Sequence, residues 1–181
     1  MQIIIFTLLL APYSLAQDNT LPKSITILDK SLSIKENKGD SVGFIAEYIP
    51  KNETFDNWTT MFAIRFVGDK ELDPMSSAVT TSNKIKERKA KGDKIANSII
   101  LQSNDKKSIA VDFFISDGDI YEHNVWRYLK TSNGLVSYQI ARRIYSKNSE
   151  EIKKFINSVP DARDKILKEI TRKDLPIPKH Q

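Results

Sequence analysis

The chain of 181 residues contains no cysteine, so its fold holds without disulfide bonds. Its 28 basic and 23 acidic residues give a formal net charge of +5. Because dedicated nucleic-acid binders gather a larger excess of positive charge on one face, this mixture of both signs argues against that class.

The N-terminus has the pattern of a secretory signal peptide. An apolar run from Ile3 to Ala11 precedes Ser14-Leu15-Ala16, which places small residues where signal peptidase reads the chain before Gln17. The run is shorter than the roughly 20 apolar residues of a membrane-spanning helix. We therefore expect a signal peptide at 1–16, export to the periplasm or out of the cell, and no transmembrane span in the mature chain. Since no Lys or Arg precedes the run, an uncleaved hydrophobic tail is the alternative.

The first half of the mature chain predicts strands followed by a helix. Residues 24–33 alternate apolar and polar side chains, and residues 42–46 continue the alternation after the turn-like segment 35–40, which together predict a hairpin. A loop beginning near residue 50 leads to a further strand at 58–67. The pair Asp73-Pro74 favours the start of a helix over 74–91, and Gly92 favours its end.

The second half predicts four consecutive antiparallel strands and a kinked helix. The strands are expected at 97–103, 108–116, 120–131 and 135–146, separated by turns at 104–107, 117–119 and 132–134. Asn148 and Glu151 have the spacing of a helix capping box, and Pro160 must kink or restart that helix. We expect one α+β domain at 17–173, in which a single antiparallel sheet is covered by two helices as in an α/β/α sandwich, and an extended tail at 174–181.

Two resemblances accompany this pattern. The segment from Glu47 to Phe62 contains Glu-Tyr-x-Pro followed by Asn-Trp-Thr-x-Met, and it resembles small exported bacterial proteins of unknown function. The order of elements is similar to the sandwich of the extrinsic oxygen-evolving-complex proteins of photosystems. These resemblances imply a compartment and a fold, and they transfer no catalytic residue.

Catalytic patterns are weak in this sequence. His123 lies near Asp117, Asp119 and Glu122, whereas His180 lies in the tail. The two aspartates suit a turn, and their spacing fails the calcium-loop pattern, so we expect no metal and no cofactor. With no cysteine and no serine in a nucleophile motif, the sequence favours a protein that is not an enzyme. A small hydrolase using acidic residues near His123 is the alternative.

A basic segment occupies the exposed side of the predicted helix at 74–91. Lys84, Arg88 and Lys91 recur at helical spacing and form a basic patch. Such a patch suits adhesion to an anionic surface, although a merely solvated helix face is the more common reason for this spacing.

Aromatic residues surround the predicted loop after residue 50. Tyr48, Phe55 and Trp58 come from this region, and Trp126 and Tyr128 come from the strands at 120–131. They predict either the sealed end of a hydrophobic core or a binding site, because aromatic side chains are enriched both in cores and at contact hot spots. The leading hypothesis is an exported, non-enzymatic domain of the bacterial envelope that binds a protein, a peptide or a glycan through these residues.

Overall fold

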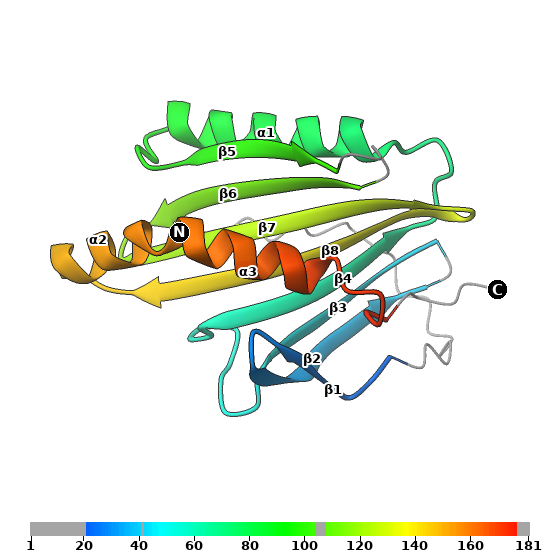
Figure 1. Ribbon diagram of the computed structural model, residues 1–181, viewed down its shortest axis with the longest axis horizontal. Helices are drawn as coiled ribbons and strands as arrows, with labels where there is room; N and C mark the ends of the chain where they lie inside the picture. The colour runs from blue at the N-terminus through cyan, green and yellow to red at the C-terminus, as the bar shows by residue number, and fades with distance from the viewer. Residues whose placement is uncertain (1–20, 41, 104–107, 177–181) are drawn as a thin grey trace.

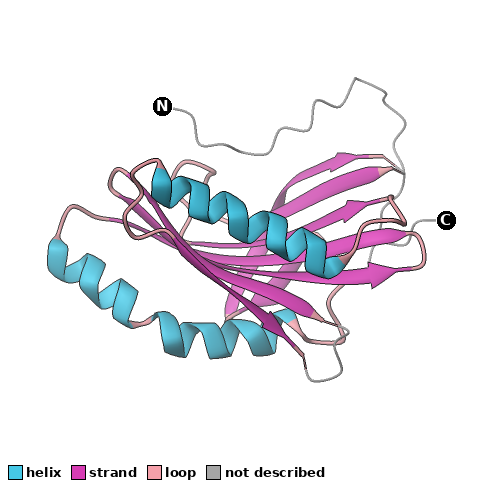
Figure 2. Ribbon diagram, turned by 90° about the horizontal axis from the view of Figure 1, so that it is seen from above, coloured by secondary structure: helices cyan, strands magenta, loops and turns pink. Residues whose placement is uncertain are grey.

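The computed structural model describes residues 21–40, 42–103 and 108–176. The predicted signal peptide, the predicted turn at 104–107 and His180 lie outside these residues. Within them the chain forms one antiparallel sheet of eight strands and three helices, with α1 on one side of the sheet and α2 and α3 on the other (Figures 1 and 2).

The strands lie in the order β1-β2-β3-β4-β8-β7-β6-β5 across the sheet. Their bounds are β1 Ser24–Ile27, β2 Lys30–Gly39, β3 Gly43–Pro50, β4 Thr60–Val67, β5 Asn97–Gln102, β6 Ile109–Asp117, β7 Ile120–Thr131 and β8 Gly134–Tyr145. The helices are α1 Pro74–Ala90, α2 Ser149–Asn157 and α3 Val159–Ile170. The chain thus builds one half of the sheet from β1 to β4, makes α1, and builds the other half from the far edge inward, so that β8 closes against β4.

The four strands predicted in the second half are confirmed, as are the starts of the helices. The Asp73 carboxylate accepts a hydrogen bond from the Ser76 amide at 2.8 Å and caps α1. Asn148 caps α2 in the same way, and the helix restarts as α3 just before Pro160. These local rules act within one turn of chain, which is why sequence alone finds them.

The predicted N-terminal hairpin is wrong in its turn. The chain reverses at Leu28 and Asp29, which have φ values of 50° and 61°, and so residues 24–33 form parts of two strands. The segment 35–39, predicted as a turn, continues β2 to Gly39. Turns with two positive φ values usually contain Asn or Gly. Because Leu28 stands in this turn, the sequence does not indicate a chain reversal there.

The predicted sandwich with two covering helices is also wrong. The structure is mostly sheet, with α1 packed on β5, β6 and β7, and α3 packed on β7 and β8. A helix is about 10 Å across and strands lie about 4.8 Å apart, so one helix covers about two strands. Eight strands are too wide for that arrangement, and part of one sheet face has no helix over it.

The sheet closes its main core by curling around α3. We call the face toward α3 the inner face and the face toward α1 the outer face. The inner-face core joins Ile27 of β1 and Ala110 of β6 with Ile166 and Ile170 of α3. Leu175 of the predicted extended tail packs into this core with 4% exposure. A second cluster lies between α1 and the outer face of β6 and β7. No helix in the described part of the chain is long and apolar enough to cross a membrane.

Candidate functional site

The outer face of β3, β4, β8 and β7 carries a row of polar side chains beyond the reach of α1. Antiparallel alternation sends every second residue of each strand to this face. We call the row the outer-face ladder; its members are Glu47, Arg65, Gln139, Asn124, Glu122 and Arg143. Four neighbouring strands therefore contribute to a single polar surface.

Hydrogen bonds join the first four members of the ladder across four strands. Arg65 Nη2 donates to Glu47 Oε1 at 3.1 Å, and Arg65 Nη1 donates to Gln139 Oε1 at 2.7 Å. Gln139 Nε2 in turn donates to Asn124 Oδ1 at 2.8 Å. Since Gln139 is 7% exposed and Asn124 is 1% exposed, these bonds satisfy groups that water barely reaches.

The second half of the ladder ends at Arg143, which pairs with Glu122 and contacts aromatic rings. Asn124 Nδ2 donates to Glu122 Oε2 at 3.3 Å, and Arg143 Nη2 donates to Glu122 Oε1. The Arg143 guanidinium lies 3.8 Å from the centre of the Trp58 ring, and its Nη1 donates to the Tyr145 hydroxyl at 3.0 Å. Cation–π contact and hydrogen bonds together fix this guanidinium.

A second stack supports the middle of the ladder. The Arg65 guanidinium lies 4.7 Å from the centre of the Trp126 ring. Burial lowers the pKa of Arg65, and the charge of Glu47 opposes that shift. Burial raises the pKa of Glu47, and the charge of Arg65 opposes that shift in turn. The two charges therefore stabilise each other on a partly desolvated surface.

The loop between β3 and β4 is fixed by its own polar side chains. The Glu53 carboxylate accepts hydrogen bonds from the amide of Thr59 at 2.6 Å and from its hydroxyl at 2.9 Å. Asn57 Oδ1 accepts from the amide of Thr54 at 2.7 Å. This held loop places Trp58, which is 3% exposed, beneath Arg143 in a small cluster with Ile49 and Met61.

The aromatic residues predicted as a binding set divide between the two faces. Trp58 and Trp126 both lie on the outer face and underlie the ladder arginines. Tyr128 lies on the same face beneath α1, where its hydroxyl and that of Thr81 are 2.7 Å apart. Tyr48 is fully buried in the inner core, and Phe55 is 40% exposed on the loop.

The predicted basic patch also divides. Lys84 and Lys91 are exposed, whereas Arg88 is half-buried. Arg88 Nη2 donates to the Ser116 carbonyl at 2.8 Å, and its Nε lies 3.4 Å from Asp93 Oδ2. Arg88 thus ties the end of α1 to β6.

The residues around His123 form a buried polar group of a different kind. His123 Nε2 donates to Asp112 Oδ1 at 2.8 Å, and Arg163 of α3 donates to the other carboxylate oxygen. His123 is 0% exposed and Asp112 is 3% exposed, so the pair lies between the sheet and α3. Asp117, Asp119 and Glu122 are not part of this pair. Among the described residues, no group of three His, Asp or Glu side chains is placed to hold a metal ion.

Sequence reasoning missed most of the ladder. Arg65 and Gln139 are 74 positions apart, and nothing local links them before the strand register is known. The detectable part is the alternation of Glu122, Asn124 and Trp126 along β7, which marks one strand face as polar and aromatic.

A protein-family model matches residues 20–175 of the chain. The chain belongs to that family. The family is uncharacterised, and its match covers the whole sheet and all three helices. No curated protein and no solved structure matches the chain.

Proposed function

We propose that this is an exported, non-enzymatic binding protein of the bacterial envelope, and that it binds a partner protein at the Trp58 end of the outer-face ladder. The observation that carries the proposal is the grouping of contact-prone side chains there. Phe55 and Tyr145 are each 40% exposed, and Arg143 is held between Tyr145 and Trp58. Aromatic residues and arginine are the types most enriched at the energetic centres of protein interfaces.

The rigidity of this region supports binding. Arg143 is already stacked and hydrogen-bonded, and the loop at 51–59 is held by Glu53 and Asn57. A partner would therefore order few side chains on contact, which lowers the entropic cost of association. The ladder contains two glutamates and two arginines, so its balanced charge suits a partner surface of mixed charge better than a polyanion.

The proposed compartment rests on the sequence. The apolar run and the small residues before Gln17 support export, and the resemblance of residues 47–62 to small exported bacterial proteins agrees with it. Periplasmic retention and release from the cell are both compatible with that pattern.

Site-specific crosslinking tests the proposal. A photoreactive phenylalanine at Phe55 or at Tyr145 should capture the same protein in the cells that produce the chain. Val42 and Val79 provide matched controls, since they are 67% and 41% exposed. Val42 directly precedes β3, at the end away from the loop at 51–59, and Val79 lies on α1. Capture at the first two positions and at neither control is the expected result.

A binding measurement with the purified, captured protein decides the role of the surface. Tyr145→Ala and Arg143→Ala should each weaken binding by about tenfold, which corresponds to about 1.4 kcal/mol. Circular dichroism checks that both variants fold. Equal capture at the control positions, unchanged affinity in folded variants, or capture of a glycan or a short peptide would each show that the proposal is wrong.

A further inference from the structure

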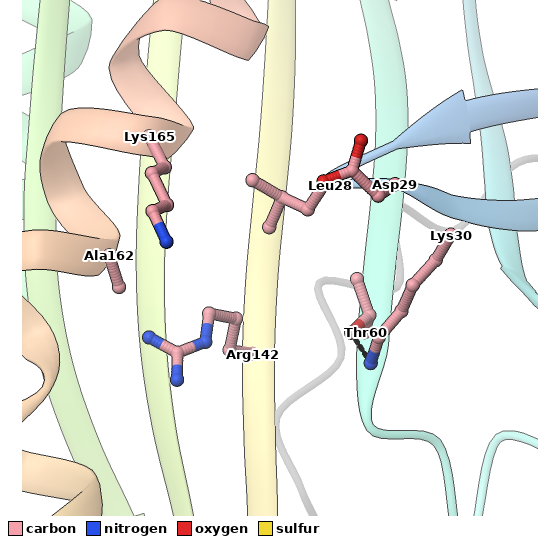
Figure 3. A pocket seen from close by; sticks show the side chains of 7 residues that line it. All are labelled: Leu28, Asp29, Lys30, Thr60, Arg142, Ala162 and Lys165. Atoms are coloured by element: carbon pink, nitrogen blue, oxygen red, sulfur yellow. Dashed lines mark hydrogen bonds between the residues drawn. The ribbon is translucent and has the colours of Figure 1, made fainter.

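A pocket of about 380 Å³ lies at the inner face of the sheet, where the β1–β2 turn approaches α3. Figure 3 shows Lys165 of α3 and Arg142 of β8 extending toward the same space, with Lys30 reaching Thr60 from the other side. In the sheet register Thr60 lies opposite Arg142, so β4 and β8 supply adjacent parts of the wall. The pocket is separate from the outer-face ladder, since none of the ladder residues lines it.

Positive charge dominates the lining. Lys30, Arg142 and Lys165 line the pocket together with one acid, Asp29. Lys30 Nζ donates to the Thr60 hydroxyl at 2.8 Å. In the described parts of the chain, none of these three cations forms an ion pair. The lining therefore carries an uncompensated charge of about two units at neutral pH.

Arg142 has no acidic partner among the described residues, unlike Arg65, Arg143 and Arg163. Arg65 and Arg143 each pair with a glutamate, and Arg163 pairs with Asp112. Arg142 instead donates Nη2 to the Ser158 hydroxyl at 3.2 Å and lies 5.2 Å from the centre of the Phe155 ring. Its Nη1 is buried and has no hydrogen-bond partner among the described residues. Arg142 thus brings to the pocket wall a guanidinium that no carboxylate among the described residues neutralises.

The rim of the pocket is held in an uncommon conformation. Leu28 and Asp29 have positive φ values of 50° and 61° in the two-residue turn that faces α3. A leucine rarely adopts this region, and Leu28 keeps it while its side chain packs against the main core. The turn thereby fixes the position of Lys30 beside Thr60.

We propose that this pocket binds a small organic phosphate monoester. A monoester carries a charge close to −2 at neutral pH, which matches the uncompensated charge of the lining. Arginine and lysine are the side chains that bind phosphate oxygens most readily, and the volume lies in the range of small-molecule sites. Leu28 adds an apolar surface for the organic part of the ligand.

Calorimetric titration of the purified chain with glycerol 3-phosphate, inorganic phosphate and glycerol tests this inference. Saturable binding of glycerol 3-phosphate is expected, with no binding of glycerol. If inorganic phosphate binds as tightly, the phosphate group alone is recognised, and if it binds more weakly, the ester contributes. Both of these results support the site, whereas no saturable binding of either phosphate overturns it.

Variants locate the binding. Lys165→Gln should weaken glycerol 3-phosphate binding by about tenfold. Lys168→Gln is the matched control, because Lys168 is also exposed on α3 and does not line the pocket. Arg142→Gln should abolish binding in a protein whose circular dichroism is unchanged. Since Lys165 is exposed, its variant keeps the test decisive even if Arg142→Gln fails to fold. Equal losses in Lys165→Gln and Lys168→Gln would show diffuse attraction to α3 and overturn the inference.

Discussion

Replacing Asp112 with asparagine removes the carboxylate that joins α3 to the sheet. In the native chain both carboxylate oxygens are used, one by His123 Nε2 at 2.8 Å and the other by Arg163. Asparagine has nearly the same volume, so the change alters charge and hydrogen bonding and leaves no cavity. Its amide group can still accept one hydrogen bond, but its NH₂ group cannot accept the second.

The expected loss of stability follows from the burial of His123 and Arg163, the two partners of Asp112. A hydrogen bond to a charged group contributes about 1.5–3 kcal/mol, against about 0.5–1.5 kcal/mol for a neutral one, so the bond to His123 loses about 1 kcal/mol. The Arg163 side chain is 32% exposed, so water replaces part of its lost bond, and its share is about 1–2 kcal/mol. We expect Asp112→Asn to lower the free energy of unfolding by about 2–3 kcal/mol. For a chain of this size the melting temperature then falls by about 4–12 °C.

Urea unfolding followed by circular dichroism measures this loss. Asp164→Asn is the control, because Asp164 is exposed on the same helix as Arg163 and its variant should stay within about 0.5 kcal/mol of the native chain. A double-mutant cycle with Arg163→Gln should give a coupling of at least about 1 kcal/mol. A loss under about 1 kcal/mol together with no coupling would refute the role of Asp112 as the link between α3 and the sheet.

The loss of stability in Asp112→Asn should depend on pH. Burial would raise the pKa of Asp112, but the hydrogen bonds and charges of His123 and Arg163 outweigh burial and hold the pKa below its usual value. A carboxylate with a lowered pKa in the folded state stabilises the fold above the pKa of the unfolded chain, near 3.9, and this contribution is lost as the pH falls through the folded value. The difference in free energy of unfolding between the native chain and Asp112→Asn should therefore become smaller only below about pH 4. If this difference stays constant as the pH falls below about 4, the pKa of Asp112 is not lowered in the folded chain.

Three further substitutions test other parts of the fold. Gln139→Ala breaks the middle of the outer-face ladder and leaves a guanidinium hydrogen and an amide oxygen without partners, so urea unfolding should show a loss of about 1–3 kcal/mol. Gly134→Ala should cost more than Gly118→Ala by at least about 1 kcal/mol, because a Cβ at Gly134 meets the Val67 carbonyl at 2.1 Å and one at Gly118 meets nothing within 4 Å. Asp29→Asn keeps a residue that tolerates positive φ and removes the one acid of the pocket, so titration should show tighter glycerol 3-phosphate binding at unchanged stability.

The second half of the fold was predictable because nearby turn and capping residues determine where its strands and helices begin and end. The turn at 117–119 contains Gly118 with a φ of 58°, and the capping residues Asp73 and Asn148 act within three positions of themselves. The β1–β2 turn was not predictable in this way, since Leu28 takes a positive φ without the usual glycine or asparagine. Tertiary packing of Leu28 against the core decides that turn.

The candidate site was predictable only in part. Trp58 and Trp126 were identified as aromatic residues near a loop and on a strand, and the structure places both on the outer face. The arginines above them come from β4 and β8, and their approach depends on a register that sequence periodicity does not give. The position of Tyr48 beside the loop predicts that it joins the binding residues, but alternation along β3 sends its side chain to the inner core.

The register of β8 against β4 connects the two proposed sites. Arg142 and Arg143 are consecutive, and alternation along β8 sends Arg142 to the inner pocket and Arg143 to the outer-face ladder. The Arg143 amide donates to the Thr59 carbonyl at 3.0 Å, and Thr60 lies opposite Arg142. A slip of one residue would exchange the faces of both arginines. Substitutions of the side chains should instead separate the sites, with Arg142→Gln removing phosphate binding alone and Arg143→Ala weakening partner binding alone.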